Sequence, residues 1–130
     1  MASLHIWRAT LSYSREHRRV WAKAHKEKLK REQPEVYFQR KFKGHLSAYK
    51  VTLEWYELML REQQGLCASC RRPETIKLRG KTKRLCVDHN HKTQFVRGLL
   101  CSGCNAALGL LDEDPLRIRA LVEYLERTDG

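Results

Sequence analysis

The chain has 130 residues and a formal net charge of +11, with 26 Lys and Arg against 15 Asp and Glu. This length suits one small domain with an extension and not two ordinary domains. The positive charge favours a polyanionic partner, most commonly nucleic acid. No run of 18 apolar residues occurs, so we expect no membrane-spanning helix, and the N-terminus lacks the apolar stretch of a secretory signal. We expect a cytoplasmic protein with reduced cysteines, although Arg and Ser without an acid before Glu16 also fit an organelle transit peptide.

The positive charge is concentrated at the beginning of the chain. Residues 1–50 hold 13 Lys and Arg against 4 Asp and Glu, whereas residues 51–130 hold 13 against 11. We expect residues 1–50 to form a basic, mostly helical extension that binds nucleic acid, and residues 51–130 to form the domain that carries the site. A charge run is often only a solvated helix face, and that alternative stays open for the extension.

Helix signals occur in both parts of the chain. The segment 14–33 is rich in helix formers, and Pro34 ends this helix or begins the next segment. Thr52 is placed as the N-cap of an amphipathic helix that Gly65 would stop. Asp114, followed by Pro, is a typical start for a closing helix.

Short apolar pieces alternate with turn residues between the helices, over residues 66–104. The pieces 84–87 and 95–100 are predicted to be the two strands of a hairpin. Helices around one short hairpin predict the α+β fold class.

Four of the five cysteines form two C-x-x-C pairs, separated by 30 residues. Each pair can place two thiolates on one ion, and two pairs complete a closed tetrahedral zinc site without a position for water. Redox pairs or disulfides are the alternatives, but neither pair lies near a βαβ pattern, and five cysteines is an odd number. We therefore predict a structural zinc ion at Cys67, Cys70, Cys101 and Cys104, and we expect Cys86 to be a small buried side chain.

A second group of polar residues lies inside the predicted zinc loop. Asp88, His89 and His91 occur together, and Asn105 directly follows the last cysteine. Zinc would bring Asn105 near this segment, where the side chains offer oxygen and nitrogen ligands that suit Mg²⁺ or Mn²⁺. The imidazole of His89 can accept a proton from water near neutral pH. The alternative is that both histidines are spare zinc ligands or solvated turn residues; their place between the cysteine pairs favours the metal-site interpretation.

These motifs match a known family. The segment VDHNHKTQFVRGLLCSGCNAALG, residues 87–109, closely resembles the phage recombination endonuclease VII family of HNH nucleases. Residues 52–70, TLEWYELMLREQQGLCASC, resemble the family's first helix and cysteine pair, so the resemblance covers roughly residues 52–125. It implies a zinc-stabilised ββα-metal (HNH, or His-Me finger) domain, in which a hairpin and a helix hold one catalytic divalent ion.

The resemblance also implies roles for single residues. Asp88 and Asn105 would be ligands of the catalytic Mg²⁺ or Mn²⁺, and His89 would be the general base that activates water. His91 would be a supporting ligand or a phosphate contact. Arg97, whose guanidinium can hold a phosphate bidentately, and Lys92 are candidate DNA contacts.

The implied function is a metal-dependent DNA endonuclease, encoded by a phage or prophage and acting in the host cytoplasm. It would nick DNA or cut both strands, alone or with other phage proteins. The alternative from another class is a catalytically silent zinc module that binds DNA.

The sequence departs from the family pattern in two places. Gln94 and Phe95 stand where members typically have Gly-Lys, so we expect a different hairpin turn. Leu108 stands where the family's Holliday-junction resolvase has an acidic residue, which argues against junction resolution in particular. The chain ends 21 residues after Gly109, without the long region through which the resolvase dimerises, so monomer and dimer both stay open.

Overall fold

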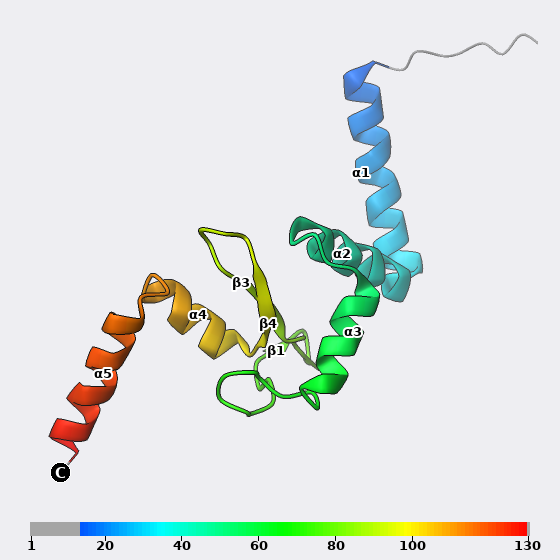
Figure 1. Ribbon diagram of the computed structural model, residues 1–130. Helices are drawn as coiled ribbons and strands as arrows, with labels where there is room; N and C mark the ends of the chain where they lie inside the picture. Colours follow the sequence, from blue (N-terminus) through cyan, green and yellow to red (C-terminus); the bar gives the residue numbers. More distant parts are fainter. Residues whose placement is uncertain (1–13, 130) are drawn as a thin grey trace, which may run out of the picture. The chain divides into compact units, whose positions relative to one another are not determined.

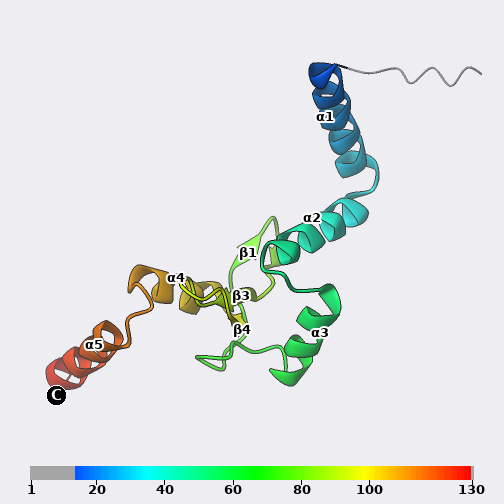
Figure 2. The same cartoon turned by 45° about the horizontal axis from the view of Figure 1, so that its top comes forward.

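The computed structural model describes residues 14–129, and residues 1–13 and 130 lie outside the described part. Figures 1 and 2 show helix α4 following directly from strand β4 and lying beside it. The elements in chain order are α1 Arg15–Glu32, α2 Pro34–Ala48, α3 Leu53–Glu62, β1 Lys77–Leu78, β2 Lys81–Thr82, β3 Cys86–His89, β4 Val96–Leu100, α4 Ser102–Leu110 and α5 Pro115–Thr128. The expected α+β class is confirmed.

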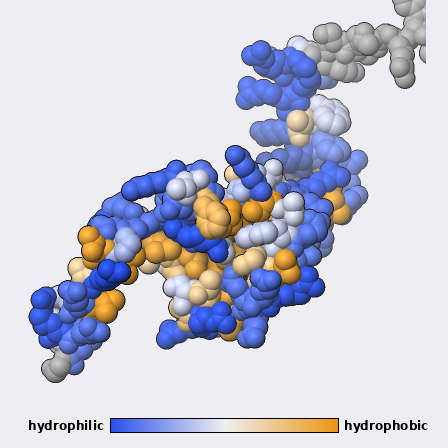
Figure 3. All heavy atoms as spheres, viewed as in Figure 1, coloured by the Kyte–Doolittle hydropathy of each residue, from blue (hydrophilic) through white to orange (hydrophobic). Residues whose placement is uncertain are grey.

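Two compact units divide the chain, residues 1–42 and residues 43–130. Every buried apolar side chain of residues 14–129 lies in the second unit: Leu46, Tyr56, Cys67, Leu85, Val87, Leu99 and Leu100. Helix α1 buries no residue, and the face drawn in Figure 3 shows it covered mainly by hydrophilic side chains. The core is therefore small and belongs to the unit that contains the cysteines.

The helix boundaries follow capping chemistry. The Ser14 hydroxyl accepts from the backbone N–H of His17 at 3.2 Å, and Pro34 begins α2 directly after α1. Thr52 caps α3 in the same way, accepting from the Trp55 N–H at 3.2 Å. The chain leaves α3 through Gln64 and Gly65, whose φ angles are 56° and 72°, so Gly65 occupies the expected left-handed position. The predicted helix starts are confirmed.

A buried glutamine joins α3 to β4. Gln63 is 6% exposed, and its side-chain amide donates to the carbonyls of Leu66 at 2.8 Å and Leu99 at 2.9 Å. Its Oε1 accepts from the Leu99 N–H at 3.0 Å. A Cβ at Gly98 would lie 3.2 Å from this Oε1, so the absence of a side chain there lets the glutamine approach the strand. Sequence reasoning did not single out Gln63.

The antiparallel pair β3–β4 forms the central hairpin, with Val87 opposite Leu99 and Asp88 opposite Gly98. Its register is irregular between Asp88 and His89. The hairpin was predicted from the sequence. Its first strand was expected at residues 84–87 but lies two residues later, at Cys86–His89, where pairing with β4 begins. Irregular pairing at this point lets consecutive side chains of β3 depart from strict alternation.

The turn of this hairpin accommodates the departure at Gln94. Gln94 adopts φ 63°, a left-handed conformation that glycine adopts more readily. The Asn90 carboxamide oxygen accepts from the N–H groups of Lys92 at 2.8 Å and Thr93 at 2.9 Å. These bonds hold the turn without a glycine at that position.

A second, two-stranded hairpin, β1–β2, was not predicted. Arg79 and Gly80 form its turn with φ angles of 53° and 78°, the signature of a type I′ turn. Its strands are two residues long and carry exposed side chains, so the sequence lacks the apolar alternation by which a strand is recognised.

The last helix begins as predicted, with the Asp114 carboxylate accepting from the Leu116 N–H at 2.8 Å and with Pro115 at the first position. Its apolar stripe is exposed, and α5 buries no residue. Within residues 14–129, no helix combines the length and apolar character that crossing a membrane requires.

Candidate functional site

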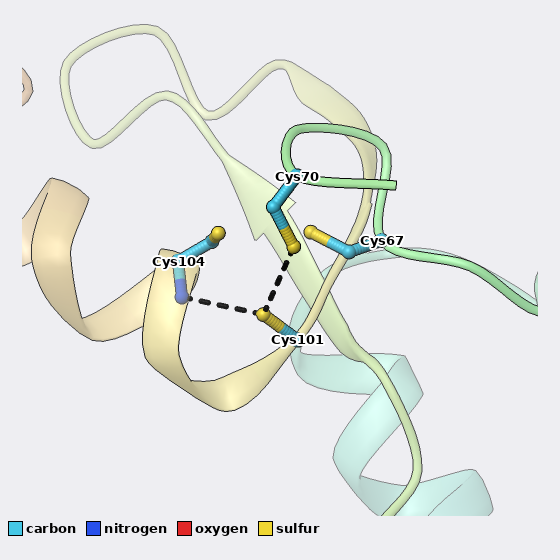
Figure 4. A group of neighbouring side chains, drawn as sticks. All are labelled: Cys67, Cys70, Cys101 and Cys104. Carbon is cyan, nitrogen blue, oxygen red and sulfur yellow. Dashed lines mark hydrogen bonds between the residues drawn. The ribbon is translucent and has the colours of Figure 1, made fainter. Parts of the chain in front are cut away.

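The four predicted cysteines come together. One ligand atom from each of Cys67, Cys70, Cys101 and Cys104 lies within 4.8 Å of all the others, and Figure 4 shows the sulfur atoms converging. The Sγ atoms of Cys70 and Cys101 are 3.9 Å apart. Four sulfurs at the usual Zn–S length would be separated by about 3.8 Å around a tetrahedral ion. The cluster could thus hold a structural metal such as zinc, and all five cysteines are free thiols.

The thiols of the cluster influence one another strongly. Burial acts to raise the pKa of Cys67, but hydrogen bonds from backbone groups of the cysteine loops outweigh it and lower the pKa to about 6. Burial and the neighbouring thiols raise the pKa of Cys104 to about 12. A negatively charged thiolate in the cluster therefore disfavours ionisation of the neighbouring thiols, and a bound cation would remove this repulsion.

A glutamate holds the first turn of α4, next to the cluster. The Glu74 carboxylate accepts from both the backbone N–H and the hydroxyl of Ser102, each at 2.7 Å. It also accepts from the N–H groups of Thr75 and Ile76 at 2.9 Å. Burial acts to raise the pKa of Glu74, but these hydrogen bonds lower it to about 2. Sequence reasoning missed this contact, since 28 residues separate its partners.

Asp88 lies in β3, is only 7% exposed and is paired with an arginine of β4. Arg97 donates to both carboxylate oxygens, with Nε–Oδ2 at 2.7 Å and Nη2–Oδ1 at 2.9 Å. The hydrogen bond to Asp88 raises the pKa of Arg97, which is a cation at any physiological pH. Arg97 was expected to contact a phosphate bidentately, and in this structure it makes its bidentate contact with Asp88 of the same chain.

A second carboxylate, missed by sequence reasoning, completes this network. Glu113 follows α4, and its Oε1 lies 2.9 Å from Arg97 Nη2. Its Oε2 accepts from the backbone N–H of His91 at 3.3 Å, and the His91 ring Nδ1 lies 3.6 Å from Oε1. Desolvation acts to raise the pKa of Glu113, but the hydrogen bonds from Arg97 and His91 hold it below its ordinary value.

The ring of His89 contacts two other rings. Its ring centroid is 5.0 Å from that of Tyr49 and 4.9 Å from that of His91. Neither ring nitrogen hydrogen-bonds to another residue of the described chain. The imidazole is therefore held by ring packing and keeps its nitrogens for water or a ligand.

Asn105 lies in the first turn of α4, half-buried, and α4 packs against both strands of the β3–β4 hairpin. Its side-chain amide has no hydrogen-bond partner among residues 14–129. Lys92 is exposed in the hairpin turn. The four cysteines form the only described group of three or more His, Cys, Asp or Glu side chains that could share one ion. The assignment of a second ion to Asp88 and Asn105 is a proposal.

A hairpin followed by a helix, beside four clustered thiols, defines a small α+β domain equipped for a structural metal. The sequence profile of the recombination endonuclease VII family matches residues 43–127. The chain belongs to this family, and the resemblance seen in the sequence is confirmed. The matched segment coincides closely with the second compact unit.

Two mycobacteriophage proteins are similar to the chain. The Gene 59 protein of Mycobacterium phage D29 is 40% identical over 83 residues, which cover 63% of this chain and 47% of that protein. The Gene 59 protein of Mycobacterium phage L5 is 41% identical over 81 residues, which cover 62% of this chain and 46% of the relative. The matches thus span about half the length of these curated relatives. No solved structure matches.

Proposed function

We propose that the chain is a metal-dependent HNH DNA endonuclease with a structural zinc site. The observation that carries the proposal is the Asp88–His89 pair of β3, lying beside helix α4 in a chain of the recombination endonuclease VII family. A module that only binds DNA needs neither an available imidazole nor a carboxylate next to it.

The donor chemistry of the proposed catalytic site fits a hard divalent cation. Asp88 offers carboxylate oxygens and Asn105 an amide oxygen, which are ligand types that Mg²⁺ and Mn²⁺ prefer. Asp88 already pairs with a cation, Arg97, so the carboxylate lies at a place where positive charge is accommodated. A divalent ion held by Asp88 and Asn105 would supply positive charge to the phosphate during hydrolysis.

The chain's own residues supply the rest of the proposed reaction. His89 accepts the proton of the attacking water through a ring nitrogen, while the rings of Tyr49 and His91 pack against the imidazole. His91 lies next to this imidazole, and Arg97 donates to the backbone carbonyl of His89, so both side chains can contact the phosphate. The oxygen of this water bonds to phosphorus as the bond from phosphorus to the 3′ oxygen breaks, and the 3′ oxygen takes up a proton from solvent, which leaves 5′-phosphate and 3′-hydroxyl ends.

The basic extension, residues 1–50, is proposed to supply general DNA affinity. Described residues 14–33 carry exposed Lys and Arg on a helix without a buried face, which suits contacts to phosphates and not to a protein core. Lys92 in the exposed hairpin turn is a further candidate contact. We propose action in the cytoplasm of the host cell, on DNA, with the structural zinc ion at the four cysteines.

The testing experiment incubates the zinc-loaded protein with supercoiled plasmid, with and without Mg²⁺ or Mn²⁺, beside the His89→Ala variant. We expect metal-dependent conversion to open-circular or linear DNA, and its loss in His89→Ala while zinc content and DNA binding persist. Added imidazole should restore part of the lost rate, since it replaces the missing base. Open-circular product alone indicates nicking.

One observation favours a second candidate, the catalytically silent DNA-binding module. Arg97 occupies both oxygens of Asp88, as a purely structural ion pair would. A wild-type protein that shifts DNA in a gel but cleaves none with either metal would favour this second function. Full cleavage by His89→Ala would refute the general-base assignment.

A further inference from the structure

A single arginine is shared between two carboxylates at the proposed catalytic site. The Nη2 atom of Arg97 lies 2.9 Å from Asp88 Oδ1 and 2.9 Å from Glu113 Oε1, and it also donates to the His89 carbonyl at 3.2 Å. The Nε atom contacts Asp88 alone, at 2.7 Å. The guanidinium can therefore lose its bonds to Asp88 and still remain at the site through Glu113.

The Glu113 carboxylate connects three segments that are distant in sequence. It binds Arg97 on β4 and the backbone N–H of His91 after β3, while its own backbone follows α4. Its side chain is only 13% exposed, although it belongs to a loop. An ordinary surface glutamate would point into solvent, so this contact pattern indicates a defined task.

The loop that presents Glu113 is built for this orientation. Asp112 and Glu113 both adopt left-handed φ angles, 53° and 54°, which cost about 1 kcal/mol or more per non-glycine residue. The Glu113 N–H donates to the Leu108 carbonyl at 2.9 Å and closes the end of α4. The turn thereby directs the carboxylate back toward the hairpin.

Because Arg97 donates hydrogen bonds to both carboxylate oxygens of Asp88, it competes with any divalent ion for this carboxylate. We propose that Glu113 is a positioning residue, which keeps Arg97 and His91 beside Asp88. When the Asp88 carboxylate binds a divalent ion instead of Arg97, the Glu113 carboxylate retains the guanidinium at the site. The inference rests on the proposed function. Without Glu113, Arg97 would have Asp88 as its one carboxylate partner in this network and would compete harder with the ion.

The test measures Mn²⁺ binding to the zinc-loaded full chain by calorimetry and cleavage of a DNA duplex in parallel. Glu113→Gln is compared with Glu123→Gln, a matched change on the exposed surface of α5, and Asp88→Asn identifies the site. We expect Glu113→Gln to weaken Mn²⁺ binding about tenfold or more, while Glu123→Gln leaves it unchanged.

A double variant separates positioning from a merely structural role. Adding Arg97→Met to Glu113→Gln removes the competing cation, so Mn²⁺ affinity should return to the wild-type value or exceed it, although cleavage stays slow. Weak binding by both the single and the double variant would overturn the inference, since Glu113 would then act by stabilising the fold.

The outcomes distinguish the inference from the function on which it rests. If wild type binds Mn²⁺ and cleaves DNA, and Glu113→Gln does both equally well, the inference fails and the proposed function stands. If wild type shows neither Mn²⁺ binding nor cleavage, the proposed function fails and the inference falls with it. Displacement can be followed directly by the NMR signal of Arg97 Nε–H, which should shift on addition of Mg²⁺ in wild type.

Discussion

Gln63 shows how one buried polar side chain can hold two elements in register. It makes three hydrogen bonds, two of them to the backbone of Leu99, a residue of β4 with no exposed surface. An apolar side chain of the same length would fill the space but would leave the Leu99 N–H without its acceptor and the Leu66 carbonyl without its side-chain donor, while the Leu99 carbonyl would keep the hydrogen bond from the Ala68 N–H.

We therefore expect Gln63→Met to lower the free energy of unfolding by about 2–4 kcal/mol. Gln39, which is exposed on helix α2, offers a matched control as Gln39→Met. Chemical denaturation of the zinc-loaded proteins measures the difference. Equal midpoints for the two variants would show that these buried hydrogen bonds contribute nothing to stability.

Single cysteines permit a comparably sharp test of the proposed zinc site. Cys67 is fully buried within the cluster, whereas Cys86 lies outside it, with its Sγ 4.0 Å from the Ser102 hydroxyl. We expect native mass spectrometry to find one zinc ion per chain in wild type and in Cys86→Ser, and none in Cys67→Ser. Cys67→Ser should also lose its cooperative thermal transition, because a structural zinc site contributes directly to folding. Retention of zinc by Cys67→Ser would contradict the four-thiolate assignment.

At the scale of elements, helix α4 depends on a contact from a distant loop. Glu74 binds both polar groups of Ser102 in the first turn of α4, where the helix dipole favours a negative charge. The same short helix carries Cys104 and Asn105. Weakening this contact should therefore loosen the helix at the point where both proposed metal sites draw a ligand.

We expect Glu74→Gln to lower the thermal midpoint at neutral pH, with a cost of about 1–2 kcal/mol for the lost charge-assisted hydrogen bonds. The folded-state pKa of Glu74, about 2, lies below its ordinary value of 4.5. Its stabilisation is thus complete above about pH 4.5 and is lost as the pH falls toward 2.

The difference in midpoint between wild type and Glu74→Gln should accordingly be constant from pH 7 to 5 and shrink at lower pH. Scanning calorimetry at several pH values measures it, and Glu123→Gln serves as the control. A difference that grows as the pH falls would show that the carboxylate of Glu74 is not preferentially ionised in the folded state.

The elements differ in how far the sequence could predict them. The helices from Ser14, Thr52 and Asp114 carry local caps, so each start was predicted correctly. The β1–β2 hairpin escaped prediction because its short strands have no apolar alternation. Helix α5 carries apolar side chains, yet it buries no residue.

The candidate site was predictable where spacing encodes it. The C-x-x-C pairs fix the cysteine cluster by local geometry, and the structure confirms that the four thiols meet. Glu74, Gln63 and Glu113 were missed because their partners lie 28, 36 and 16 residues away. An acidic or amide residue in a loop carries no local sign of such a partner, so only the folded chain reveals these contacts.

At the scale of the whole molecule, the positive charge is concentrated at the start of the sequence, and the buried residues that the structure describes lie after residue 42. This arrangement allows a test with DNA. Residues 1–33 contain nine Lys and Arg, and described helix α1 buries none of its side chains. We expect deletion of residues 1–33 in the His89→Ala background to weaken DNA binding. The slope of log affinity against log salt should fall by about 0.9 for each phosphate contact that is lost. Fluorescence anisotropy over a salt series measures both, and an unchanged slope would exclude the extension as the phosphate-binding element.

Because α1 contributes nothing to the buried core, the proposed function would have a consequence for DNA in a host cell that is short of zinc. The proposed DNA binding by α1 requires only positive charge. The proposed catalytic site, in contrast, requires a zinc ion that joins the two cysteine pairs at either end of residues 67–104. Molecules that have not acquired zinc would then occupy DNA as inactive competitors of the loaded ones. Under metal limitation, a rising dose of this protein would protect DNA instead of cutting more of it.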